Sequence, residues 1–258
     1  MKNTILNKKD AELIEEAILK YGQIISTAHL LKIFQKKYKK NSAYNRIQKL
    51  YKLGWLLRIK KGLYLIVDNI TSRSMNTMSL LRIAQALHKN SYISLNWALN
   101  YYQMFDQYSH NIISINYQIS KKYKFSEQNF RFIKISKKYY FGFTQIREEG
   151  KLINIASREK ALIDYLYLMQ NFYAANLVFE KIKEHQTDID FLKLQKYILK
   201  YGVSMQRKIG FLLDQINIDT NFLFKKIQKR NIGFSKFTKE SKKFNAKWRI
   251  YYEDRIIN

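Results

Sequence analysis

The sequence predicts an α+β protein: a helical N-terminal part, a middle part with a small mixed sheet, and a helical C-terminal part. Three observations support this prediction. Apolar residues recur at helical spacing in the first 53 residues, segments between 111 and 155 alternate like strands, and helical spacing returns from Tyr173 onward. The chain of 258 residues exceeds the usual size of one domain, so we expect two, at 1–70 and 75–258.

The first 67 residues predict three short helices followed by a hairpin. We expect helices at 8–21, which Gly22 ends, and from Ser26 or Thr27, one of which caps it, through 34. The residues between these two helices, 24 and 25, form an extended link. A third helix, capped by Asn41 or Ser42, ends at Gly54. The helices should bury one apolar cluster, made of Leu13, Ala17, Ile18, Leu30, Leu31, Phe34, Ile47 and Leu50.

The stretch from 55 to 67 predicts a β-hairpin with a basic tip. Two apolar runs, 55–57 and 63–67, flank Arg58, Lys60 and Lys61, and Gly62 can take the positive φ that a tight turn needs. A polar helix followed by such a hairpin is typical of a winged helix-turn-helix, whose third helix fits the major groove of DNA. The sequence therefore predicts an N-terminal DNA-binding domain.

The candidate DNA contacts lie on the third helix and around the hairpin. Side chains that suit base edges are Ser42, Tyr44, Asn45 and Arg46, and those that suit phosphates are Lys49, Arg58, Lys60 and Lys61. Thr27 and Gly62 complete the predicted set. The competing interpretation is that these residues form an ordinary solvated surface, which is the commoner meaning of a single basic helix. The order of the predicted elements favours DNA binding.

Charge is the strongest compositional signal. The chain has 47 Lys and Arg against 20 Asp and Glu, a net charge of +27, and its first 67 residues alone carry 15 basic and 4 acidic side chains. A biased base composition can favour Lys over Arg, but it does not explain so few acidic residues. We therefore expect a negatively charged partner, with nucleic acid ahead of an anionic membrane surface.

Several classes of site have no candidate residues. The chain has no cysteine, which excludes disulfides and cysteine zinc sites, and the histidines at 29, 88, 110 and 185 lack metal-ligand spacing. No glycine-rich phosphate loop or nucleophile elbow occurs. Glu159 and Asp164 lie about 140° apart around a helix, so they would not form a nuclease pair. We expect no enzyme activity, no cofactor and no metal.

We also expect a cytoplasmic protein that does not enter a membrane. The first residues lack the apolar core of a signal peptide, and no apolar run approaches the roughly 18 residues that a membrane span needs.

The middle and C-terminal parts predict strands and then helices. We expect strands at 111–117, 129–135, 139–146 and 151–155, with a turn at 148–150, and a helix capped by Ser157. Further helices should lie near 173–185, 189–201, 204–217 and 220–229, and a strand at 247–252 could join the sheet. The exposed aromatic candidates for a partner surface are Tyr101, Tyr102 and the run 139–141.

Three segments resemble the AbiEi-type antitoxins, the transcriptional regulators of abortive-infection (type IV) toxin-antitoxin systems. They are LGWLLRIKKGLYLIV (53–67), SYISLNWALNYY (91–102) and INIASREKALIDYLYL (153–168). In that family the second segment is a short strand leading into a helix with a small capping residue. The resemblance implies that the protein represses its own operon by binding double-stranded operator DNA upstream of its gene. It also implies that the protein neutralises a cognate nucleotidyltransferase toxin in phage defence.

The sequence is also compatible with other functions. The basic surface could recognise structured RNA by its shape, or the protein could be a solitary winged-helix regulator without a toxin partner. A third possibility is a protein-interaction module whose charge serves only solubility. Steep salt dependence of binding would argue against the last of these.

Overall fold

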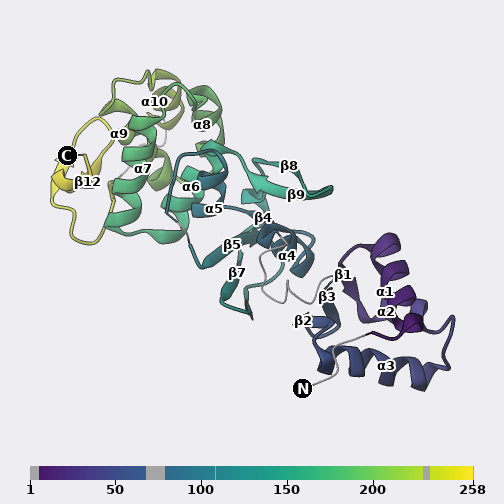
Figure 1. The fold of residues 1–258 in the computed structure, drawn as a ribbon. Coiled ribbons are helices and arrows are strands. Elements are labelled where there is room, and N and C mark those ends of the chain that lie inside the picture. The colour runs from purple at the N-terminus through teal and green to yellow at the C-terminus, as the bar shows by residue number, and fades with distance from the viewer. Residues whose placement is uncertain (1–5, 68–78, 108, 229–232, 258) are drawn as a thin grey trace. The chain divides into compact units, whose positions relative to one another are not determined.

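The computed structural model describes residues 6–67, 79–107, 109–228 and 233–257, and it is a mixed α+β protein (Figure 1). The chain divides into two compact units. Unit 1 comprises 1–90, 121–131 and 147–153, and unit 2 comprises 91–120, 132–146 and 154–258. The expected domain boundary between residues 70 and 75 lies outside the described residues.

The N-terminal part of unit 1 contains three helices and a three-stranded sheet in the order β1-β3-β2 (Figure 1). Its elements are α1 (Lys8–Tyr21), β1 (Ile24–Ser26), α2 (Thr27–Phe34), α3 (Lys40–Leu53), β2 (Leu56–Lys60) and β3 (Leu63–Ile66). The expected extended link is strand β1, which pairs antiparallel with β3. This pairing joins the link between the first two helices to the hairpin.

Local capping explains where these helices begin and end. The Ser26 side chain caps α2, as predicted, and Gly54 ends α3 in the left-handed conformation with φ 86°. The predicted cap of α3 is wrong. Lys39 is the capping residue, without a side-chain hydrogen bond, and its carbonyl accepts from the Ala43 amide at 2.8 Å. Asn41 and Ser42 therefore lie inside the first turn, with exposed side chains.

The predicted apolar cluster forms the core of this part. Leu13, Leu30, Phe34 and Ile47 are at most 1% exposed, and residues from the hairpin, including Leu56, complete the core. Two members of the predicted set, at positions 18 and 31, are only partly buried against it. Burial of several large apolar side chains, each contributing roughly 1.5–3 kcal/mol, holds the three helices together.

A mixed sheet of six strands runs in the order β6-β7-β5-β4-β9-β8. Its strands are β4 (Tyr92–Ile93), β5 (Asn111–Asn116), β6 (Lys121–Phe125), β7 (Gln128–Lys134), β8 (Phe143–Glu148) and β9 (Lys151–Ala156). Strand β4 pairs antiparallel with β5 and parallel with β9, which makes the sheet mixed, as expected. Residues 149 and 150, both at positive φ, form the predicted turn between β8 and β9.

Two predictions about this region are wrong, and one strand was missed. The segment 139–146 is not one strand, because a 3-10 turn (η2, Lys137–Tyr139) and Gly142 at φ 76° precede β8. Strand β6 was not predicted, because its lysines hide the apolar alternation. The short strand β4 leads into α5 (Asn96–Tyr101), but no side chain caps that helix.

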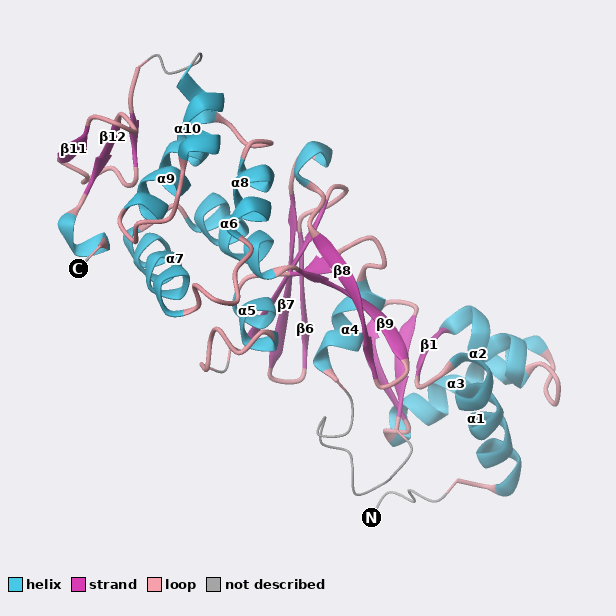
Figure 2. Ribbon diagram, turned by 90° about the horizontal axis from the view of Figure 1, so that it is seen from above, coloured by secondary structure: helices cyan, strands magenta, loops and turns pink. Residues whose placement is uncertain are grey.

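Helix α4 (Leu80–Leu87) precedes the strands of this sheet. The helices that follow them, as predicted, are α6 (Arg158–Met169), α7 (Phe172–Glu184), α8 (Phe191–Ile198), α9 (Val203–Asp214) and α10 (Asn221–Gln228). Figure 2 shows α6 to α10 gathered together. Ser157 caps α6, as predicted. None of the helices in the described ranges has the length and apolarity to cross a membrane.

The C-terminal strands form a sheet of their own rather than joining the larger one, which corrects the last strand prediction. Strand β12 (Ile250–Tyr252) lies between β10 (Ser235–Lys236), to which it is parallel, and β11 (Lys243–Asn245), to which it is antiparallel. Because both edges of β12 are paired within this sheet, it has no edge left for another strand. The fully buried Trp248 anchors the sheet on α9, where Gly210 leaves room for the indole ring.

Candidate nucleic-acid interface

Helix α3 presents a polar face opposite the side that it packs into the core. Ala43, Ile47 and Leu50 are at most 1% exposed, while Ser42, Tyr44, Asn45 and Lys49 are exposed. The exposed set contains hydroxyl, amide and ammonium groups, which can contact base edges and phosphates. Helix α3 is therefore anchored along one side and has donors and acceptors along the other.

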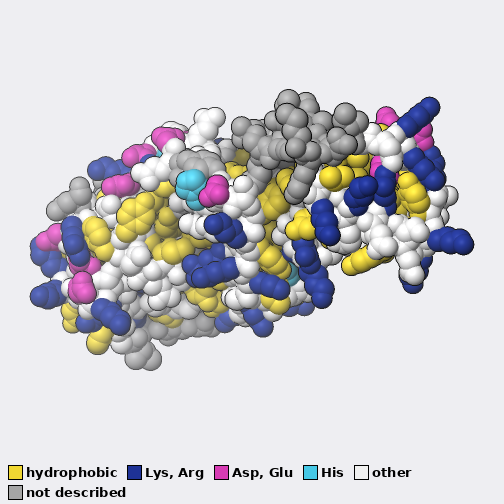
Figure 3. All heavy atoms as spheres, turned by 60° about the horizontal axis from the view of Figure 1, so that its bottom comes forward, with side chains coloured by type: hydrophobic (Ala, Val, Ile, Leu, Met, Phe, Trp, Pro, Cys, Tyr) yellow, Lys and Arg dark blue, Asp and Glu magenta, His cyan; other side chains and the backbone are white. Residues whose placement is uncertain are grey.

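Positive charge without an acidic partner is found on α3 and the β2–β3 hairpin. Two lysines between α2 and α3, Lys36 and Lys37, form ion pairs with glutamates of α1. Lys49, Arg58 and Lys61 are exposed and form no ion pair with another residue in the described ranges. Lysine and arginine side chains outnumber acidic ones on the face drawn in Figure 3. Such cations are suited to phosphate groups.

The structure brings Thr27 and Gly62 together. The Thr27 amide, at the start of α2, donates to the Gly62 carbonyl at 3.0 Å. Gly62 has φ 82°, and a side chain there would meet no atom within 4 Å, so backbone strain rather than space favours glycine. This hydrogen bond fixes the turn that carries Lys61 beside the first turn of α2.

Arg46 lies on the side of α3 that faces α1. Its Nε atom donates to both carboxylate oxygens of Asp10, at 2.8 and 2.7 Å, and its Nη2 atom forms an ion pair with the same group. The Asp10 side chain is 3% exposed and that of Arg46 is 23% exposed. The hydrogen bond with Asp10 raises the pKa of Arg46. The guanidinium thus joins α3 to α1 and is not available to a base edge while this pair is intact.

Lys60 also has a partner within unit 1. Its Nζ atom donates to the Leu87 carbonyl at the end of α4, at 2.7 Å, and lies 6.0 Å from the centre of the Tyr123 ring. Burial, and to a smaller degree the charge of Lys121, lowers the pKa of Lys60. Of the predicted hairpin cations, Arg58 and Lys61 are exposed, whereas Lys60 is half-buried.

A buried ionic cluster in unit 2 was not predicted. Lys160 and Asp164 of α6 form an ion pair at 0% and 1% side-chain exposure. The Lys160 amine also donates to the hydroxyls of Tyr92 and Tyr201, at 2.8 and 3.1 Å, and Asp164 accepts from Ser94 at 2.9 Å. Burial lowers the pKa of Lys160 and raises that of Asp164. In the sequence, this pair could have been inferred from the spacing of four residues between Lys160 and Asp164 in KALID, which places them on one side of a helix.

Glu159, which the sequence places at the start of this helix, is also held by partners. It forms an ion pair with Lys193 at 2.8 Å and accepts from the Ser157 hydroxyl at 2.8 Å. These hydrogen bonds lower the pKa of Glu159 against the opposing effect of burial. It therefore serves to join α6 to α8.

The predicted aromatic surface is only partly exposed. Tyr101 is 47% exposed, and Tyr102 packs against the guanidinium of Arg158. Tyr139 is buried, with its ring stacked on Tyr201 at 4.4 Å between centres. Residue 139 is thus part of the packing of unit 2.

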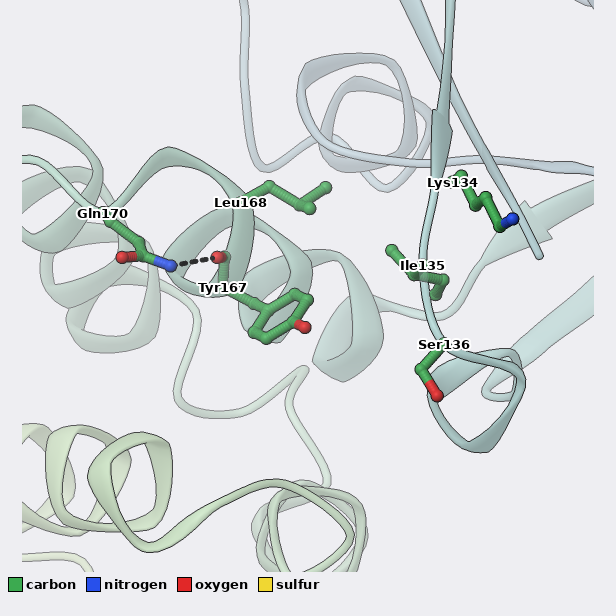
Figure 4. A pocket seen from close by; sticks show the side chains of 6 residues that line it. All are labelled: Lys134, Ile135, Ser136, Tyr167, Leu168 and Gln170. Atoms are coloured by element: carbon green, nitrogen blue, oxygen red, sulfur yellow. Dashed lines mark hydrogen bonds between the residues drawn. The ribbon is translucent and has the colours of Figure 1, made fainter. Parts of the chain in front are cut away.

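A hollow of about 560 Å³ lies in unit 2, between the end of β7 and the end of α6 (Figure 4). Its lining residues are Lys134, Ile135, Ser136, Tyr167, Leu168 and Gln170. They offer one ammonium and two hydroxyls but no carboxylate or imidazole, so we assign no chemistry to it. Across the described ranges, no group of three or more His, Asp or Glu side chains is placed to hold a metal ion.

Comparison with known proteins gives the fold but no family. No protein-family model matches the chain, and no curated protein sequence matches it. The chain is similar to the crystal structure of the RV2827C protein from Mycobacterium tuberculosis, with a TM-score of 0.64, covering 98% of this chain and 94% of that one. The two sequences are 11% identical, so the similarity concerns the fold alone.

Proposed function

We propose that the protein is a DNA-binding transcriptional regulator whose first 67 residues act as a winged helix-turn-helix. The observation that carries this proposal is the exposed polar and basic face of α3 beside the β2–β3 hairpin. The order helix, strand, helix, helix, hairpin supports it, because in a winged helix-turn-helix the third helix enters the DNA groove and the hairpin lies beside it.

The roles of the individual residues follow from what each one contacts. Ser42, Tyr44 and Asn45 are exposed on α3 and are the proposed base-edge contacts. Lys49, Arg58 and Lys61 are the proposed phosphate contacts, with the Thr27–Gly62 hydrogen bond positioning the hairpin turn. Arg46 and Lys60 are not among the proposed direct contacts, because the Asp10 carboxylate and the Leu87 carbonyl hold them.

A gel-shift titration against the region upstream of the gene tests this assignment. Asn45→Ala should weaken binding to that DNA by roughly 1–3 kcal/mol and leave binding to random duplex unchanged. Lys61→Ala should weaken both duplexes about equally and reduce the salt slope by about 1. Lys20→Ala removes the same charge from an exposed position on α1 and is the matched control. Equal losses for all three variants would refute the proposal.

Competition separates DNA from the RNA alternative. Duplex DNA from the upstream region should displace a labelled operator fragment far better than an equal amount of structured RNA. If structured RNA competes as well as the operator, the basic surface recognises RNA shape instead.

We further propose that the protein neutralises a nucleotidyltransferase toxin and represses the operon that encodes both. The support is the resemblance of three segments to the AbiEi-type antitoxins, together with the proposed DNA-binding face. An adjacent nucleotidyltransferase gene is the expected finding. Co-expression of this protein should then restore growth that the toxin arrests. If growth is not restored while operator binding is intact, the protein acts as a solitary regulator without a toxin partner.

A further inference from the structure

The C-terminal sheet exposes a row of aromatic side chains on one side. Phe244 of β11 pairs directly with Tyr251 of β12, which in turn pairs with Lys236 of β10. Residues paired across strands point to the same side of a sheet, and so do residues two apart within a strand. Phe234, just before β10, is placed on this side by its ring contact with Tyr251, and Lys242 lies just before β11, two positions from Phe244. We call the set Phe234, Lys236, Lys242, Phe244 and Tyr251 the aromatic face.

Two of its rings are largely open to solvent. Phe234 is 62% exposed and Phe244 is 49% exposed, and Tyr251 lies between them. The centre of the Tyr251 ring is 5.3 Å from that of Phe234 and 4.9 Å from that of Phe244. The rings are inclined by 81° and 48°, so they do not stack on each other. Both phenylalanine rings thus keep about half or more of their surface exposed.

The opposite side of the sheet has a different character. Ser235, Phe237 and Ile250 alternate with the aromatic face and are buried. Phe237 packs edge-on against Phe211 of α9 at 5.7 Å. Core packing therefore accounts for the inward side of this sheet, whereas the outward phenylalanines contact Tyr251 and remain exposed.

The aromatic face includes two lysines. Lys236 lies over the Tyr251 ring at 5.5 Å, and Lys242, just before β11, is exposed. Glu253, two positions after Tyr251, falls on the same alternation, and its carboxylate is already held by the Thr238 hydroxyl and by Arg255. The region from 205 to 258 contains 13 basic and 5 acidic residues. An occupant with flat apolar groups and negative charge fits this composition.

The backbone that carries Phe234 is held in place before any ligand binds. The Arg249 side chain donates from Nε to the Gly233 carbonyl at 2.7 Å, and the Ser235 amide donates to the Arg249 carbonyl at 3.0 Å. Arg249 has φ 50°, an uncommon conformation for this residue type. A ring on a fixed backbone loses little conformational entropy when it stacks on a ligand.

We propose that the aromatic face binds an unpaired segment of RNA. Bases would stack on Phe234 and Phe244, and Lys236 and Lys242 would contact the phosphates between them. Aromatic side chains on an open sheet with nearby cations are suited to unpaired bases, whereas paired bases keep their faces inside the duplex. Among nucleic acids, RNA is the expected ligand, because its loops and ends display unpaired bases. This surface belongs to the C-terminal sheet and is independent of the proposed contacts of α3.

Fluorescence anisotropy with a labelled single-stranded RNA of eight nucleotides tests the inference on the full chain. The double variant Phe234→Ala/Phe244→Ala should bind at least about 25-fold more weakly, at fivefold or more for each ring lost. Phe234→Leu/Phe244→Leu keeps the apolar bulk but removes the π-faces, and it should lose affinity in the same way. Lys236→Ala should lower the salt slope by about 0.7.

Matched controls make the result specific. Tyr173→Ala removes an exposed aromatic side chain (53%) from α7, and it should bind the RNA like the wild type. Operator binding by the double variant should also be unchanged, which separates this inference from the proposed function. Wild-type affinity in the leucine variant, or an equal loss in Tyr173→Ala, would overturn the inference. If a single-stranded DNA of the same sequence binds more tightly than the RNA, the choice of RNA is overturned.

Discussion

The buried pair of Lys160 and Asp164 gives the sharpest prediction about stability. Replacing Lys160 with Met leaves the Asp164 carboxylate buried among hydroxyl groups, with Tyr92 and Ser94 donating to it at 3.1 and 2.9 Å. Removing one partner from a buried pair costs about 3–5 kcal/mol, because the remaining charge has lost its compensation. At about 2–4 °C for each kcal/mol, Lys160→Met should lower the melting temperature by about 6–20 °C.

A double-mutant cycle separates the pair from its surroundings. Asp164→Leu alone should cost a similar amount, because the Lys160 ammonium then lies among aromatic rings without a carboxylate. The double variant Lys160→Met/Asp164→Leu buries no charge and should be more stable than either single variant. Urea unfolding followed by circular dichroism measures all four proteins. Additive losses in the double variant would refute the reasoning.

The pH dependence of Lys160→Met tests the same reasoning by another route. Burial already raises the pKa of Asp164, and removal of the neighbouring ammonium should raise it further. Below pH about 4 the Asp164 carboxyl group is protonated in both the folded and the unfolded protein, so its burial involves no charge. As the pH rises through the folded-state pKa, the unfolded state loses its proton first, and the folded state becomes less stable relative to it. The stability gap between Lys160→Met and the wild type should therefore widen between pH 4 and pH 8. A constant gap would contradict the prediction.

Two further predictions concern packing. Arg46→Met should destabilise the N-terminal part by about 2–3 kcal/mol, measured by hydrogen exchange of α1 and α3, because it leaves Asp10 buried without its cation. Unchanged exchange with lost operator binding would instead assign Arg46 to the DNA groove. Gly210→Ala should cost more than about 3 kcal/mol in urea unfolding, since the new Cβ atom would lie 2.3 Å from the Trp248 ring. Gly202→Ala, with no atom within 4 Å of the new Cβ, is the control, and an equal loss there would refute the packing argument.

Local patterns predicted most of the elements because their causes lie close together in sequence. The spacing of Leu13 and Ala17, the capping side chain of Ser26 and the left-handed Gly54 each act within a few residues. The start of α3 was misplaced, since Lys39 adopts the capping conformation without a side-chain signal that a sequence could display.

The roles of charged side chains could not be predicted in the same way. Arg46 and Asp10 are 36 residues apart, and Lys60 and Leu87 are 27 apart, so no local pattern relates them. A strand such as β6 escaped prediction because its lysine-rich residues show no apolar alternation, and its place in the sheet depends on its neighbour β7.

The sequence by itself determined the fold class, the positions of most helices and the basic character of the chain. Only the tertiary structure decided which cations are exposed and which are held by partners, as Lys61 and Lys60 on neighbouring positions illustrate. It also decided that the last strands form a separate sheet with an open aromatic face. The physical reason is range: helix periodicity and caps depend on neighbours in the chain, whereas burial and ion pairing depend on residues that only folding brings together.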